Sequence, residues 1–342
     1  MRLRLLSCAL FVAACSGSSS DPTTASNAST CGGGDHELAA GTVDPNDTQL
    51  AVGNGYVWYG HRGGANGELA RIPIAGGPGD TIVGAPIAAF AIGTGGSVAW
   101  TIAPASSDSP TVIELRDPSG ATTPIPLPDG VSTVNALAFD HAGNLFMLSD
   151  IVIRGFGNGV SIWRWSAERN AFDLLHKLPS GLGPLFPDGD GMAWVAPTDS
   201  GDGVRIFHED AIGGAPAPGP EVPTGGTIIG VDAQKIYYVG PDRLGIGSID
   251  RAALTHANEV TFPEPRPTSG TDVSVVDDTF YWRAIDGSSG DATIWRAAKN
   301  GGAPTQFASA VELGLPSVGS CAVAFLQKSD ESGSWSIMTK SR

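Results

Sequence analysis

Charged side chains recur in segments that we expect to be loops, and they are the groups in this chain best suited to chemistry. Carboxylates that converge can bind a cation such as Ca²⁺, whereas arginine mixed with aspartate can receive a polar partner. A third interpretation is a solvated loop charge that binds nothing. The residues in question are His61, Arg62, Asp150, Arg154, Asp199, Asp202, Arg243, Arg283, Asp286 and Asp291.

Motifs that place a catalytic group are absent from the sequence. There is no Gly-x-Ser-x-Gly elbow and no phosphate loop ending in Gly-Lys-Ser/Thr. The histidines do not form His-x-His or His-Glu-x-x-His pairs, so no zinc site is indicated. Asp188-Gly189-Asp190-Gly191 resembles the start of a Ca²⁺ loop but lacks the later Glu, and we interpret it as a hairpin turn. We assign no catalytic residue and no metal ligand, although a site drawn from distant segments would leave no such spacing.

The elements that must position these loops repeat along the chain. Short apolar-aromatic runs such as Val57-Trp58-Tyr59 and Phe280-Tyr281-Trp282 recur, and their last residues are at 59, 100, 147, 194, 238, 282 and 325. A period of about 44 residues is typical of a four-stranded propeller blade. The tryptophans recur about once per blade, which we interpret as packing between blades.

The seventh repeat lacks its fourth strand because the sequence stops at Arg342. Residues 32–40 match residues 301–309, which form the turn and outer strand of the sixth repeat. We therefore predict an all-β, seven-bladed β-propeller of four-stranded antiparallel blades over residues 32–342, closed by the N-terminal strand completing the last blade. The loops between second and third strands then share a face with the blade-to-blade connections, where ligands of propellers usually lie.

Several strand motifs resemble the YWTD and NHL classes of β-propeller. The nearest matches are Phe280-Tyr281-Trp282, Thr293-Ile294-Trp295-Arg296 and Lys299-Asn300-Gly301-Gly302, and residues 139–145 resemble the turn of an NHL unit. The resemblance covers residues 32–342 as architecture, but the first, second and fourth repeats lack a full Tyr-Trp pattern. It implies a propeller fold and does not choose among enzymes, binders and scaffolds.

The first residues are typical of an export signal. Arg2 and Arg4 precede an apolar run too short to cross a bilayer, which ends in Val12-Ala13-Ala14-Cys15. This resembles the lipobox of bacterial lipoproteins, which implies that residues 1–14 are a signal peptide and that Cys15 carries the lipid. The alternatives are an ordinary secretory signal cut near Ala14 or an unmodified cysteine. Residues 15–31 are rich in Ser, Thr and Ala, and we expect a flexible lipid-anchored tether.

Two cysteines remain after the signal and the lipid anchor, Cys31 and Cys321. We predict a disulfide between them in an oxidising compartment, and the alternative is two separate thiols. The formal net charge is −15, which argues against nucleic acid and anionic lipid as partners. Contact with the membrane is then expected through the lipid anchor alone.

From these features we expect a monomeric, non-enzymatic binding or scaffold propeller in the bacterial cell envelope. Its partner would be an envelope protein or a polysaccharide, and Ser16 in place of a retention Asp favours the outer membrane. One alternative is a propeller hydrolase or lyase that uses a divalent cation on the loop face. Another is a structural envelope component. We expect no cofactor, with Ca²⁺ as the one candidate.

Overall fold

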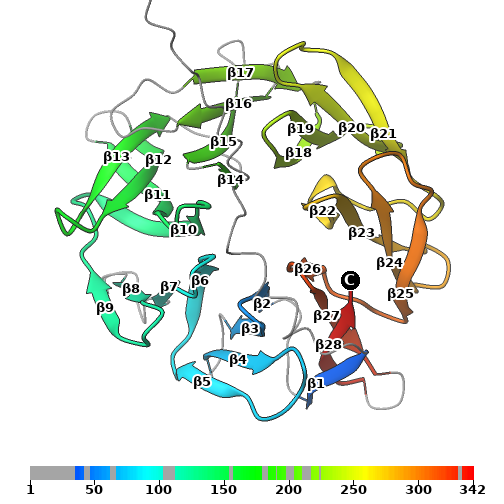
Figure 1. Ribbon diagram of the computed structural model, residues 1–342, viewed down its shortest axis with the longest axis horizontal. Helices are drawn as coiled ribbons and strands as arrows, with labels where there is room; N and C mark the ends of the chain where they lie inside the picture. Colours follow the sequence, from blue (N-terminus) through cyan, green and yellow to red (C-terminus); the bar gives the residue numbers. More distant parts are fainter. Residues whose placement is uncertain are drawn as a thin grey trace, which may run out of the picture.

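The chain forms a ring of seven sheets around a central axis (Figure 1). The computed structural model describes residues 35–41, 47–61, 67–102, 112–153, 157–178, 184–189, 191–197, 204–209, 217–222, 225–329 and 333–342. Each sheet has four antiparallel strands, and the helical element in these ranges is a single 3₁₀ turn, η1 (Gly270–Asp272). The predicted seven-bladed β-propeller is confirmed.

In blades 1 to 6 the strands run from the channel outward in chain order, whereas the outermost strand of blade 7 is the first strand of the chain. Blades 1 and 2 contain β2 (Thr48–Gly53), β3 (Tyr56–His61), β4 (Leu69–Pro73), β5 (Asp80–Val83), β6 (Ile87–Ile92), β7 (Val98–Ile102), β8 (Val112–Arg116) and β9 (Thr122–Ile125). Blades 3 and 4 contain β10 (Val131–Phe139), β11 (Leu145–Ile153), β12 (Gly157–Ser166), β13 (Ala171–Leu178), β14 (Leu185–Asp188), β15 (Gly191–Pro197), β16 (Val204–Glu209) and β17 (Ala217–Val222). Blades 5 and 6 contain β18 (Thr227–Val231), β19 (Lys235–Val239), β20 (Gly245–Asp250), β21 (His256–Thr261), β22 (Val273–Val276), β23 (Thr279–Ile285), β24 (Ala292–Ala298) and β25 (Thr305–Ala310). Blade 7 contains β26 (Ser317–Val318), β27 (Ala322–Lys328), β28 (Trp335–Ser341) and β1 (His36–Gly41).

This strand order gives the ring two different faces. We call the face with the second-to-third-strand loops and the blade-to-blade connections the loop face. The turn face carries the hairpin turns between first and second strands and between third and fourth strands. The segment after Asp188 is such a turn, with Gly189 at a φ of 61°, so the hairpin interpretation of that segment is confirmed. Loops on one face come from all blades and can build a shared site.

Apolar clusters hold each blade against the next. The cluster between blades 2 and 3, for example, packs Ile113 against Phe139 and Met147. The described residues form seven such clusters, one at every junction of the ring. Because a propeller blade is flat and apolar on both sides, burying these surfaces closes a ring rather than a sandwich. Five tryptophans are buried in this way, as predicted: Trp58, Trp100, Trp163, Trp194 and Trp282.

The N-terminal strand completes the last blade, as the sequence match predicts. β1 pairs antiparallel with β28 from His36 opposite Thr339 to Gly41 opposite Trp335, and the two lie side by side in Figure 1. Leu38 packs on the cluster that joins blade 7 to blade 1. The Glu37 carboxylate accepts a 2.8 Å hydrogen bond from the Ser336 hydroxyl. The first and last segments of the domain therefore share one sheet, and the ring has no incomplete blade.

Ion pairs on the turn face join blades 4 to 7 in a recurring pattern. A cation just after a third strand reaches an aspartate at the first turn of the preceding blade. Arg251 contacts Asp188 at 2.9 Å and Lys299 contacts Asp232 at 3.0 Å. Arg342, the last residue, does the same to Asp277. These pairs supplement the apolar clusters in the half of the ring that includes the closure.

The carboxylate of Asp232 makes the free energy of unfolding depend on pH. Burial raises its pKa, but hydrogen bonds from Tyr237, the Gln234 amide and Lys299 outweigh burial and hold the pKa below its ordinary value. A carboxylate with a lowered folded-state pKa stabilises the fold above its unfolded pKa of about 4, and this contribution is lost as pH falls through the folded-state pKa. When the pH is lowered from about 4 to 2, the unfolding free energy of the Asp232→Asn variant should therefore decrease less than that of the parent. Urea titrations across that range measure this difference, with the exposed Asp129→Asn as control. Equal slopes for the parent and Asp232→Asn would contradict it.

Candidate functional site

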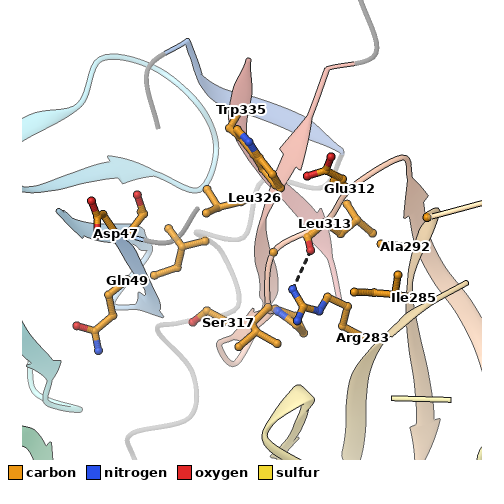
Figure 2. Close-up of a pocket in the computed structure, with 16 residues that line it drawn as sticks. Asp47, Gln49, Arg283, Ile285, Ala292, Glu312, Leu313, Ser317, Leu326 and Trp335 are labelled. Atoms are coloured by element: carbon orange, nitrogen blue, oxygen red, sulfur yellow. Dashed lines mark hydrogen bonds between the residues drawn. The ribbon is translucent and has the colours of Figure 1, made fainter. Parts of the chain in front are cut away.

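A cavity of about 610 Å³ opens on the loop face where blades 6, 7 and 1 meet. Its walls come from the end of β23 and start of β24, from the connection between β25 and β26, and from the starts of β2 and β28. Figure 2 shows Arg283 and Ser317 on one side, Trp335 and Leu326 opposite them, and Asp47 and Gln49 on a third side. The volume lies within the range of about 300–1,000 Å³ that is usual for small-ligand sites.

Arg283 is held rigidly in the wall of this cavity. Its Nη2 donates to Asp272 Oδ1 at 2.9 Å and its Nη1 donates to the Leu313 carbonyl at 3.1 Å. The Asp272 side chain is 5% exposed, whereas that of Arg283 is 22% exposed. Figure 2 shows the bond to Leu313, which ties blade 6 to the connection that leads into blade 7. A guanidinium fixed by two acceptors keeps further donor positions for a ligand.

Asp272 is in turn fixed by its own segment. It is the last residue of η1, and its Oδ2 accepts from the Thr268 hydroxyl at 2.6 Å and from the Ser269 amide at 2.9 Å. The bond from the Ser269 amide is one half of a capping box, in which the Ser269 side chain in turn accepts from a backbone amide of the turn. The buried carboxylate therefore has a partner on each oxygen and neutralises Arg283 from behind.

The remaining walls combine carboxylates with apolar surface. Glu312 pairs with Lys328, and Asp47 and Gln49 add a carboxylate and an amide at the start of blade 1. Trp335 is half-buried and packs partly on the cluster between blades 7 and 1. The cavity can therefore offer hydrogen-bond donors, acceptors and an aromatic surface to one ligand.

The structure places the predicted loop residues on different blades. His61 Nδ1 lies 2.9 Å from the Thr48 hydroxyl in blade 1, and Asp150 accepts a 2.7 Å bond from the Asn135 amide in blade 3. Arg243 donates to the Thr268 carbonyl, so Arg243 and Arg283 contact the same connection between blades 5 and 6. Arg62, Arg154, Asp199 and Asp202 lie outside the described residues.

Asp286 and Asp291 belong to the loop beside Arg283, and Gly290 of this loop lines the cavity. The Asp286 carboxylate accepts from the Ser288 amide at 2.7 Å and from the Ser288 hydroxyl at 2.6 Å. These hydrogen bonds lower its pKa. Since both bonds close the loop on itself, Asp286 orders the cavity rim. Of the predicted residues that are described, Arg283 is the one that lines the cavity.

The sequence does not single out the other polar and aromatic residues that Figure 2 labels in the cavity, among them Asp47, Gln49, Glu312 and Trp335. Asp47 and Glu312 belong to blade-to-blade connections and Gln49 to an inner strand, whereas the predicted site residues belong to loops between second and third strands. Trp335 was interpreted as packing between blades. Its position at the start of a third strand, next to the loop face, is the feature that could have indicated a role in a site.

No group of three or more His, Cys, Asp or Glu side chains that could hold a metal ion occurs among the described residues. In the same ranges, no helix is long and apolar enough to cross a membrane. Cys321 lies on the turn face at the start of β27 and is not free. Cys31 and Cys15 lie outside the described residues, so the disulfide and the lipid anchor stay predictions.

A second hollow of about 1,030 Å³ lies on the turn face between blades 6 and 7. It is lined by Arg342, Cys321 and Asp277, among others. Asp35, which leads into β1, pairs with the neighbouring Lys340 at 3.3 Å. The chain enters β1 on the turn face, so residues N-terminal to Asp35 connect to the domain on this side. The cavity on the opposite, loop face is therefore our candidate ligand site.

Comparison with known proteins identifies the fold and no family. No protein-family model matches the sequence, and no curated protein matches it. Among solved structures, the β-propeller domain of the Trilobed protease from Pyrococcus furiosus superposes with a TM-score of 0.66 at 10% identity, covering 90% of this chain and 98% of that one. An oligogalacturonate lyase from Vibrio parahaemolyticus gives 0.64 at 12% identity, covering 90% and 97%. A virginiamycin B lyase from Staphylococcus aureus gives 0.55 at 13% identity, covering 90% and 98%. Similarity at these identities shows the propeller fold alone, and a place in the YWTD or NHL classes stays a prediction.

Proposed function

We propose that this chain is a binding propeller of the bacterial cell envelope, tethered through Cys15, whose loop-face cavity between blades 6, 7 and 1 receives the partner. The observation that carries the proposal is the fixed Arg283, which faces Trp335 across a concave site with Asp47 and Gln49 beside it. Preorganised polar groups in a pocket with apolar walls are typical of ligand sites.

The direction of β1 fits a tethered binder. The strand begins at the turn face, where His36 pairs with Thr339, and ends toward the loop face, where Gly41 pairs with Trp335. A lipid anchor on the N-terminal side of Asp35 would therefore attach at the turn face. The cavity would then face away from the membrane and toward partners in the envelope.

An enzyme is the second candidate, because solved propellers that superpose on most of this chain include lyases. Asp47 and Glu312 supply carboxylates to the cavity, and a carboxylate can act as a general base or bind a divalent cation. Bound metal in the purified protein separates the two functions. Stoichiometric metal that is lost in an Asp47→Asn, Glu312→Gln double variant would favour the enzyme.

Site-specific photocrosslinking in the native envelope tests the binding function. A photoreactive side chain replaces Leu315, which is 46% exposed and lines the cavity, or Leu254, which is 58% exposed on the turn face. We expect a discrete crosslinked partner from position 315 and none from position 254. The same partner from both positions, or none from position 315, would contradict the assignment of the site.

A further inference from the structure

We propose that the loop-face cavity binds a neutral saccharide chain. This inference rests on the proposed binding function and names the ligand class. Four features support it: the polar groups in the cavity, its aromatic wall, the charge around it, and the dispersal of exposed apolar residues on the described surface.

The polar groups of the cavity match hydroxyls better than a single charge. A sugar hydroxyl both donates and accepts, so a site for it needs acceptors and donors in alternation. The Asp47 and Glu312 carboxylates accept, the Arg283 guanidinium donates, and the Gln49 amide does both. These groups come from blades 1 and 6 and from the connection between blades 6 and 7, and they surround the cavity on several sides.

The aromatic side chain in the cavity wall, Trp335, suits the apolar faces of a sugar ring. A pyranose ring has apolar C–H faces, and a tryptophan offers a broad apolar surface with one polar atom at its edge. Trp335 lines the cavity together with Leu326 and Leu313. The ring is half-buried and therefore already ordered before a ligand arrives, so little side-chain entropy is lost on binding.

The charge of the cavity argues for a neutral chain. Arg283 is compensated by the buried Asp272, and Lys328 is paired with Glu312. Asp47 then leaves the cavity with excess negative charge, and the whole chain carries a formal charge of −15. A polyanionic chain such as a polyuronate would be repelled on approach and would meet an already neutralised arginine.

The described surface lacks the apolar patch that a protein partner would need. The exposed large hydrophobic residues in the described ranges are few and lie on blades 2, 3 and 5 and on the connection between blades 6 and 7: Val112, Leu174, Leu244, Leu254, Val311 and Leu315. Stable protein interfaces bury roughly 800 Å² per partner around an apolar core. Of the six, Leu315 lines the cavity, so the concave site and not a flat patch is the favoured contact.

Titration of the mature protein with defined oligosaccharides tests the inference. The probes are glucose, galactose and mannose oligomers and, at matched length, galacturonate oligomers, with affinity measured by calorimetry. We expect a neutral oligomer to bind and the Trp335→Ala variant to lose about tenfold or more in affinity. Trp335→Phe should keep most of the affinity because the aromatic face remains. Trp165→Ala is the matched control, since Trp165 lies in the third strand of blade 3 and packs on Phe172.

The outcomes test the ligand class and the proposed binding function separately. Binding of galacturonate with no neutral oligomer bound, or equal affinity in Trp335→Ala and the parent, would overturn the neutral saccharide. If no saccharide binds while position 315 crosslinks to a protein, the ligand class is wrong and the binding function stands. If neither occurs, both are wrong. Thermal melts of each variant show that the fold is intact, and Trp335→Phe provides the test if Trp335→Ala does not fold.

Discussion

A chain that lacks residues 36–41 is expected to lose its stable ring. Removing β1 takes away every backbone hydrogen bond between β1 and β28, the contact of Leu38 with the blade 7–blade 1 cluster and the bond from Ser336 to Glu37. At about 1 kcal/mol for each net hydrogen bond and about 1 kcal/mol for a half-buried leucine, the loss is of order 5 kcal/mol or more. Single domains are stable by about 5–15 kcal/mol, so most of the stability should disappear.

The experiment compares thermal and urea unfolding of the mature chain with that of the deletion. Deletion of residues 16–30, which the sequence predicts to be tether, is the matched control and should leave the unfolding free energy unchanged. The truncated ring should also associate, because β28 becomes an exposed edge strand with unpaired donors and acceptors. A monomeric deletion variant with the parent's melting temperature would show that β1 does not close the ring.

The Arg251→Met variant is expected to lose about 3–5 kcal/mol of unfolding free energy. Arg251 reaches from blade 5 to Asp188 of blade 4, whose side chain is 6% exposed. It also donates to the Asp232 carbonyl at 2.9 Å. Without the guanidinium, the buried Asp188 carboxylate keeps His208 close by, with the Nδ1 at 2.8 Å. A buried charge that loses its main partner is costly.

Arg205→Met provides the comparison for this prediction. Arg205 belongs to blade 4, like Asp188, and pairs with Glu221, whose side chain is 54% exposed. Exposed ion pairs contribute about 0–1 kcal/mol, so this variant should stay within about 1 kcal/mol of the parent. Urea denaturation of both variants at neutral pH measures the difference. If Arg251→Met and Arg205→Met lost the same unfolding free energy, the ion pair between blades 4 and 5 would stabilise the fold no more than an exposed pair does.

The sequence predicts the ring well because the information is periodic and local. Residues 305–310 form β25 and residues 36–41 form β1, so the matched segments occupy the same place in their blades. Leu38 and Phe307 are at equivalent positions, and each packs on a cluster between blades. Alternating apolar residues specify strands, and a fixed period specifies their repetition.

The candidate site is harder to predict because its residues come from different blades and meet only in the folded ring. Arg283 lines the cavity because Asp272 and the Leu313 carbonyl hold it there, and neither partner is recognisable from spacing. Trp295 stacks on Trp282 within blade 6, whereas Trp335 faces the cavity. Residue type alone does not separate these two roles. Arg243 and Arg283 converge on one connection through contacts that no repeat encodes.

Hydrogen exchange of the intact mature chain tests the central claim that the N-terminal strand closes the ring beside the cavity, whose Trp335 lies in the strand that it pairs with. Residues 36–41 pair with residues 335–339 of β28 in blade 7. We predict slow exchange in both segments, with protection that is lost together as urea increases. Exchange of residues 36–41 at the rate of an unstructured peptide, while residues 335–341 stay protected, would contradict the closure and the site that depends on it.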